Sequence, residues 1–176
     1  YLDLKNTFRT GTFVIEKDMS VMTIVRTLKY GESKTLRLTI NNARTPEALA
    51  KKIAARSHIT EQEMLSTLRD ERLIAELGFK SAEEMFSIFL PNTYEVPCDI
   101  SPRDLVLKFK AESDKYWSSS KRQEQLKRIG FTPFEVMTMA SIVHEETNAQ
   151  SEMARIAGVY VNRLKKDMLL QADPTV

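Results

Sequence analysis

The sequence predicts an α+β protein in which a small α/β lobe precedes a mainly helical domain. Before residue 45, two segments rich in β-branched residues flank one amphipathic segment, as in a strand, helix and strand. After residue 45, apolar residues recur at helical spacing, and Thr-Pro or Ser-Pro pairs mark helix starts. We therefore expect a lobe over residues 1–43 and a helical domain over residues 44–176.

The predicted lobe has two strands, Gly11–Ile15 and Thr35–Ile40, because both segments alternate or favour β-branched residues. Between them, residues 20–30 place either Met22, Val25 and Leu28 or Ile24 and Leu28 on one face of a helix. A Gly-x-Phe-x-Ile strand followed by a Ser-Val helix start resembles the LysM-like modules that bind glycan chains. Other small α+β lobes have the same order of elements, so the order alone does not decide between them.

Capping residues predict where the later helices begin. A side-chain oxygen before the first turn accepts a backbone N–H group that has no partner within the helix, and proline suits the first helical position. Such starts occur at Thr45-Pro46, Ser101-Pro102 and Thr132-Pro133, and the spacing of a capping box occurs at Thr60 with Glu63, Ser81 with Glu84, and Thr132 with Glu135.

Glycines predict where helices end, because a left-handed residue commonly closes a helix. Gly31, Gly78 and Gly130 each follow a helical pattern. The extended segment over residues 90–97 interrupts the helical series and is predicted as a strand or a cleft wall. The predicted helices span residues 45–56, 60–77, 81–89, 102–129 with a break near 118–120, 132–147 and 150–166.

Composition and motifs argue against several functional classes. The formal net charge is only +2, which does not favour a nucleic-acid binder. The sequence has no Gly-rich phosphate loop and no nucleophile elbow, and we expect no cofactor. His58 and His144 lack partners at metal-ligand spacing, so we expect no metal site. Cys98 is the single cysteine, and a structural thiol is favoured over a catalytic pair with either histidine.

The segment that carries recognisable chemistry ends at Glu146. On a helix, this residue lies one turn beyond Ile142 and Val143 and two turns beyond Met139, so it continues an apolar stripe. Burial there would favour the neutral carboxylic acid, the form that a general acid needs to cleave a glycosidic bond. The alternative is that Glu146, with its neighbours, is simply the charged end of a helix.

The next helix is predicted to be buried. Its run Ile156–Val161 is apolar nearly all round, and Gly158 would permit a neighbour to approach closely. Asn162 and Arg163 follow as polar groups at the end of this run. They suit either helix caps or the wall of a cleft.

Three motifs in order resemble the MltG family of endolytic murein transglycosylases, also called YceG-like proteins. They are Ala-Ser-Ile-Val-x-x-Glu-Thr at 140–147, Val-x-Val-Asn-Arg-Leu at 159–164 and Gln-x-Asp-Pro-Thr-Val at 171–176. Pro91-Asn92-Thr93-Tyr94 is similar to the family's Pro-Asp-Thr-Tyr segment, and the N-terminal lobe looks like its LysM-like subdomain. The resemblance covers nearly the whole chain.

The resemblance implies a lytic transglycosylase that cleaves the β-1,4 bond between N-acetylmuramic acid and N-acetylglucosamine in peptidoglycan without water. Glu146, directly before Thr147, would serve first as acid and then as base, leaving a 1,6-anhydro end. The nucleophile belongs to the substrate, which departs from the two-carboxylate pattern of most glycosidases. By the same resemblance the substrate-binding residues would be Asn162, Gln171, Asp173 and Thr175, with Thr147 and Arg163 as supports.

The resemblance also predicts context and partners. The first residue is Tyr1 rather than Met, and the sequence stops directly after the last motif, so we expect a chain that lacks an anchor segment and the end of the catalytic domain. The full-length protein would lie at the extracytoplasmic face of the cytoplasmic membrane, with glycan strands as substrate and cell-wall synthases as further partners. A peptidoglycan-binding or synthase-binding module that does not cut strands is the alternative.

Overall fold

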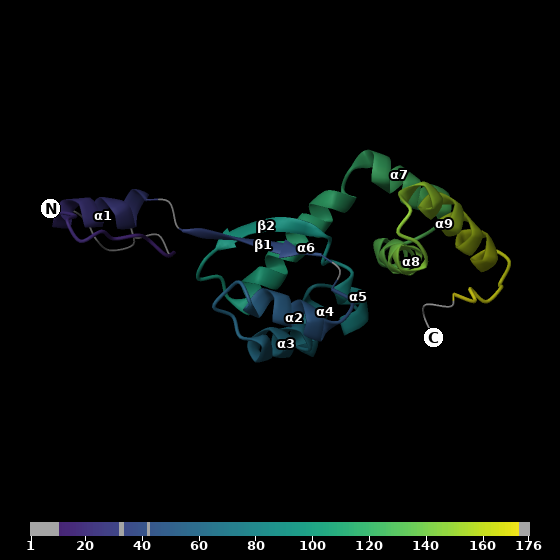
Figure 1. Cartoon of the computed structure of the whole chain (residues 1–176), viewed down its shortest axis with the longest axis horizontal. Coiled ribbons are helices and arrows are strands. Elements are labelled where there is room, and N and C mark those ends of the chain that lie inside the picture. The colour runs from purple at the N-terminus through teal and green to yellow at the C-terminus, as the bar shows by residue number, and fades with distance from the viewer. Residues whose placement is uncertain (1–10, 32–33, 42, 173–176) are drawn as a thin grey trace. The chain divides into compact units, whose positions relative to one another are not determined.

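The computed structural model of the protein describes residues 11–31, 34–41 and 43–172. This part of the chain is mainly helical with one two-stranded sheet, which confirms the predicted α+β class. The elements in chain order are α1 (Val21–Tyr30), β1 (Thr35–Ile40), α2 (Pro46–Ala54), α3 (Glu61–Leu68), α4 (Glu71–Glu76), α5 (Ala82–Phe86), β2 (Asn92–Pro97), α6 (Pro102–Trp117), α7 (Ser120–Ile129), α8 (Pro133–Glu146) and α9 (Gln150–Leu164) (Figure 1).

The chain forms two compact units. The first runs to Ser113 and the second begins at Asp114, so the boundary falls inside α6. The lobe that we expected to end at residue 43 stays a prediction. Within the first unit, β1 pairs with β2, which lies more than fifty residues further along the chain.

The sheet is antiparallel, with Leu38 opposite Tyr94 and Leu36 opposite Val96. The predicted strand over residues 11–15 is wrong, because this segment is not assigned to a strand. The Lys34 N–H donates to the Thr12 carbonyl oxygen at 2.6 Å, but β1 forms its ladder with β2. Whether a segment forms a strand depends on the strand that it pairs with. The sequence pattern of one segment does not show whether such a partner is present.

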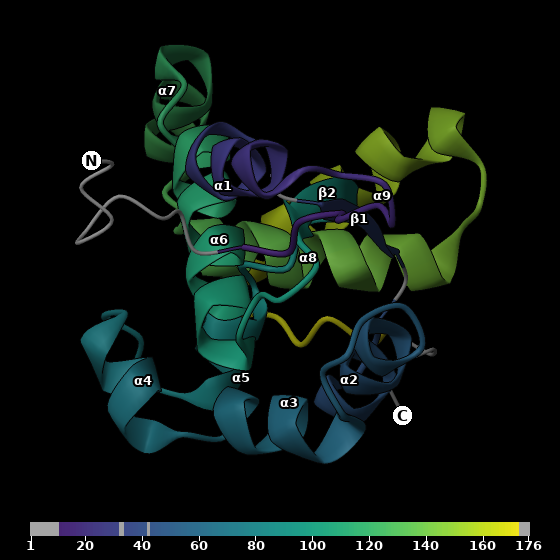
Figure 2. The same ribbon diagram turned by 90° about the vertical axis from the view of Figure 1, so that its left-hand side faces the viewer.

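Helices α2 and α3 lie on the same side of the sheet (Figures 1 and 2). Leu49 and Ile53 of α2 are fully buried, and they share one apolar core with Leu38 and with Phe109 of α6. The Tyr94 ring meets the Phe109 ring edge to face at 4.7 Å between centroids. Burial, with a smaller effect of the Glu112 charge, raises the pKa of Tyr94 to about 12.

Helix starts agree closely with the capping prediction, and Thr45, Thr60, Ser81 and Thr132 all cap helices through their side chains. The single helix predicted over residues 60–77 is wrong. The Asp70 carboxylate accepts the Arg72 N–H at 2.9 Å and starts the separate helix α4. A short carboxylate that accepts nearby backbone N–H groups competes with the hydrogen bonds of a continuous helix. The helix is therefore interrupted at Asp70, although apolar residues continue to recur at helical spacing beyond it.

Two of the three predicted glycine stops adopt the left-handed conformation. Gly78 has φ 83° and Gly130 has φ 76°. Gly31 follows α1 with φ −66° and an extended ψ, so the left-handed prediction is wrong there. Its N–H nevertheless closes α1 by donating to the Thr27 carbonyl oxygen at 2.8 Å.

The first turn of α8 generates a stability prediction. Thr132 Oγ1 accepts the Glu135 N–H at 3.2 Å, and Glu135 Oε2 accepts the Thr132 N–H at 2.7 Å. Thr132→Ala should lower the free energy of unfolding by about 1 kcal/mol, measured by urea denaturation. Thr138→Ala in the same helix is the control, because its hydroxyl bonds only to the Phe134 carbonyl oxygen. An equal loss in both variants would contradict the capping role.

The same box predicts a pH dependence. The Thr132 N–H, and then its hydroxyl, hold the pKa of the Glu135 carboxyl below the usual 4.5. The stabilisation is therefore present above about pH 5 and is lost as the pH falls through the lowered value. Glu135→Gln should be less stable than wild type by roughly 0.3–1 kcal/mol near pH 7 at low salt. The difference in free energy of unfolding between the two proteins, measured from denaturation curves, should disappear below about pH 3. A difference that grows on acidification would contradict a stabilising role for the charged Glu135 carboxylate.

Candidate functional site

Glu146 is the last residue of α8, and the helix places its side chain at the edge of the core of the second unit. Met139 and Val143 on the same face are buried, and Glu146 itself is half-buried. The predicted continuation of the apolar stripe is therefore confirmed. Glu145 and His144, round the helix, are exposed. The three neighbouring polar residues thus have different surroundings, and only Glu146 adjoins the core.

The carboxyl of Glu146 is held by Tyr160 of α9. The Tyr160 hydroxyl donates a hydrogen bond to Glu146 Oε1, and the Tyr160 ring is buried with Met139 and Val143. Helices α8 and α9 are direct neighbours in the second unit (Figure 1). Because the ring is fixed by packing, the hydroxyl holds the carboxyl in one place.

Arg163, one turn after Tyr160, ties the segment that follows α9 back to the helix. Its guanidinium donates to the Leu170 carbonyl oxygen through Nη1 and to Gln171 Oε1 at 2.8 Å through Nη2. Ala172, the next residue, is buried in the same apolar cluster as Tyr160. Gln171 has φ 53°, a conformation that non-glycine residues seldom adopt.

The predicted site residues therefore fall into two groups. Glu146 and Thr147 stand at the end of α8, where Thr147 Oγ1 accepts the Ala149 N–H at 3.0 Å and donates to Glu152 Oε2 at 3.2 Å. Arg163 and Gln171 form the second group. The cluster that contains Tyr160 and Ala172 adjoins both groups.

Three other predicted residues are not part of these two groups as the structure describes them, and two of the three lie outside the described residues. Asn162 lies on α9 with an exposed side chain. Asp173 and Thr175 lie outside the described residues, so the structure does not place them. Tyr160 was missed at the sequence level. The sequence did contain a signal, because this tyrosine lies inside an apolar run. A buried phenol hydroxyl needs a hydrogen-bond partner, so a nearby polar side chain is expected.

The prediction of a wholly buried helix over Ile156–Val161 is wrong. Tyr160 is buried, Ile156 and Ala157 are partly buried, and the Val159 side chain is 52% exposed. A Cβ added at Gly158 would meet nothing within 4 Å, so this glycine is not a point of close approach. The core reaches α9 through one face, and apolar residues on its other faces remain at the surface.

Among the described residues, the histidines, the cysteine and the other acidic side chains do not form a metal site or a second catalytic site. No set of three or more His, Cys, Asp or Glu side chains in this part of the chain could hold a metal ion. His58 lies near Cys98, but its Nδ1 bonds to the Cys98 carbonyl oxygen at 2.7 Å. Over the same residues, none of the helices combines the length and the apolar character needed to cross a membrane.

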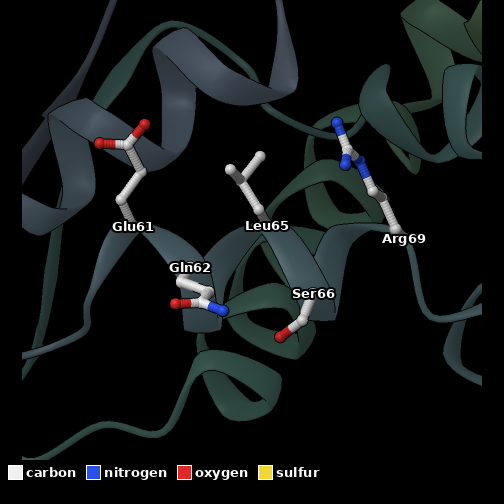
Figure 3. A pocket seen from close by; sticks show the side chains of 5 residues that line it. All are labelled: Glu61, Gln62, Leu65, Ser66 and Arg69. Carbon is white, nitrogen blue, oxygen red and sulfur yellow. The ribbon is translucent and has the colours of Figure 1, made fainter.

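A shallow hollow of about 420 Å³ lies on α3 in the first unit. Its lining comes from one helix and the residue that ends it: Glu61, Gln62, Leu65, Ser66 and Arg69 (Figure 3). Arg69 is engaged in an ion pair with Glu47 at 2.6 Å. None of the predicted site residues that the structure describes lines this hollow, and a single helix surface gives no opposed groups for catalysis.

Two proteins with similar sequences are named endolytic murein transglycosylase. An endolytic murein transglycosylase from Bacillus subtilis is 26% identical over 184 residues, which cover 96% of this chain and 51% of that protein. One from Streptococcus pneumoniae is 25% identical over 198 residues, covering 98% of this chain and 35% of that protein. The chain thus spans about half, or less, of the length of these relatives.

A crystal structure of a putative yceG-like protein from Listeria monocytogenes has a similar fold. The TM-score is 0.67 at 22% identity, and the match covers 96% of this chain and 60% of that one. The sequence model of the YceG-like family matches residues 1–176. This chain therefore belongs to the YceG-like family.

Proposed function

We propose that the protein of which this chain is part is an endolytic peptidoglycan lytic transglycosylase, with Glu146 as its single acid and base. The observation that carries the proposal is the half-buried Glu146 carboxyl, held by the buried Tyr160 hydroxyl. The relatives named endolytic murein transglycosylase support the reaction class. A positioned carboxyl at the border of core and solvent is the arrangement that general acid catalysis requires.

The proposed reaction uses one carboxyl group twice, first as an acid and then as a base. Glu146 gives its proton to the oxygen that bridges N-acetylmuramic acid and N-acetylglucosamine, and the bond from that oxygen to the muramyl anomeric carbon breaks. The muramyl 6-hydroxyl oxygen then bonds to the anomeric carbon, and its proton passes to the Glu146 carboxylate. No water is consumed, and the product carries a 1,6-anhydro ring. Since Tyr160 holds Oε1, we assign proton transfer to Oε2.

The residues of the segment after α8 would bind the sugar. Amide and hydroxyl groups can both donate and accept hydrogen bonds, so Asn162, Gln171 and Thr175 suit sugar hydroxyls. We propose Asp173 as a further sugar ligand. Arg163 would position Gln171 through the bond between their side chains, and Thr147 would hold the turn that follows Glu146.

We extend the proposal to the rest of the protein. Residues 1–43 would form a LysM-like lobe beside a catalytic domain that starts at residue 44. A membrane anchor outside this sequence would hold the protein at the extracytoplasmic face of the cytoplasmic membrane. Cell-wall synthases would be further partners there.

The first test compares Glu146→Gln with wild type in the full-length protein, using uncrosslinked glycan strands and mass spectrometry of the products. Glu146→Gln should reduce the yield of anhydro ends by at least about 100-fold, because an amide cannot give up the proton. Glu145→Gln is the matched control, since this neighbouring exposed residue undergoes the same change of charge. Reducing ends from wild type would indicate a hydrolase, and uncut strands that remain bound would indicate a binding module.

A second test addresses Tyr160 as a positioning residue. Tyr160→Phe keeps the buried ring and removes the donor to Glu146 Oε1. The lost hydrogen bond would stabilise the carboxylate that forms as Glu146 gives up its proton, so its loss should lower kcat by about tenfold. KM should change little, because the hydroxyl holds the acid rather than the sugar. Tyr30→Phe, at a residue that is 72% exposed, is the control. An unchanged kcat in Tyr160→Phe would remove Tyr160 from the mechanism.

A further inference from the structure

Basic residues are concentrated where α6 ends and α7 follows (Figure 1). Residues 115–130 contain five basic residues and one acidic residue, Glu124, which is a net charge of +4. The whole chain has a net charge of +2, so all other residues together carry −2. We call the five cations the basic junction: Lys115, Lys121, Arg122, Lys127 and Arg128.

None of the five cations of the basic junction forms an ion pair with a residue that the structure describes. In the first unit, some cations do form ion pairs. Arg69 pairs with Glu47 at 2.6 Å, and Arg103 pairs with Glu76 at the same distance. Five neighbouring cations without such partners produce a positive potential that attracts anions.

Helix stability explains only part of this cluster. Lys127 and Arg128 lie in the last turn of α7, and Lys115 lies in the last turn of α6, where the helix dipole favours cations. Lys121 and Arg122 lie in the first turn of α7, which contains no acidic residue. The dipole disfavours cations at that end of a helix, so these two residues are not explained by local stability.

Arg122 is held in place before any ligand arrives. Its guanidinium lies 3.7 Å from the centroid of the Tyr116 ring, and Nη1 donates to the Tyr116 carbonyl oxygen at 2.9 Å. The Tyr116 ring in turn meets the Trp117 ring edge to face at 5.0 Å. A guanidinium stacked on a ring still presents donors at its edge, and a fixed side chain loses less entropy on binding.

We propose that the basic junction binds the carboxylates of the peptides attached to glycan strands, an inference that rests on the proposed function. Arginine binds carboxylates through paired N–H donors, and lysines add attraction over a longer range. A membrane surface fits less well. The apolar side chain of Leu126 is buried, so α7 does not present it to lipid.

The experiment measures binding of glycan strands to the chain in a Glu146→Gln background, which keeps the strands intact. The amino groups of the strands are acetylated, which removes their positive charges. Two forms of the strands are then compared, one with unmodified carboxylates and one with the carboxylates converted to amides. Lys121→Gln/Arg122→Gln should weaken binding of unmodified strands about three- to tenfold at low salt. Binding of the amidated strands should be weak and insensitive to this change.

The matched control is Lys165→Gln/Lys166→Gln, which removes the same charge from two exposed residues of the same unit. Equal weakening by the two pairs, or equal binding of amidated and unmodified strands, would overturn the proposal. Charge-dependent binding to vesicles of anionic phospholipid, without binding to strands, would assign the surface to a membrane and would also overturn it.

The two proposals fail separately. Anhydro ends formed by the full-length protein, together with strand binding that is unaffected by Lys121→Gln/Arg122→Gln, would refute only the basic junction. Carboxylate-dependent binding through the basic junction, without anhydro ends, would refute only the catalytic proposal. Circular dichroism of each double variant checks that the helices remain folded.

Discussion

The hydrogen bond from Tyr160 to Glu146 joins the packing of two helices to the position of one carboxyl group. The Tyr160 ring is buried against Met139 and Val143, so its hydroxyl must find a partner within reach, and Glu146 supplies it. Anything that shifts α9 against α8 therefore also shifts the carboxyl. In this unit, the packing of the small apolar core therefore determines where the candidate catalytic carboxyl lies.

The register of α8 matters for the same reason. The capping box at Thr132 and Glu135 fixes where the helix begins, and Thr147, in an extended conformation, fixes where it ends. Each residue turns an α-helix by about 100°, so a slip of one position would replace Glu146 by Glu145 at the border of the core. Local chemistry at both helix ends thus selects which of two adjacent glutamates meets Tyr160.

Most features set by neighbouring residues could be predicted from the sequence, although the helix break at Asp70 was not, whereas features set by distant residues could not. The cap at Thr132 and the apolar stripe that leads to Glu146 each involve residues within a few turns of one helix. The pairing of β1 with β2 depends on residues more than fifty positions apart, and the expected strand over 11–15 failed because its pattern contains no information about that partner. Tyr160 was missed because its hydrogen bond to Glu146 joins two helices, and the periodicity of a single helix does not show which side chain of the next helix it meets.

Gln171 illustrates a feature that leaves no mark in the sequence. A non-glycine residue at φ 53° is strained by roughly 1–3 kcal/mol, and such residues persist only where surrounding contacts enforce them. Here Arg163 binds the Gln171 side chain and the carbonyl oxygen before it, while Ala172 is buried directly after it. Glycine would adopt this backbone without strain but would lose the amide. The side chain, rather than the turn, therefore accounts for glutamine at this position, which agrees with the sugar-binding role proposed for it.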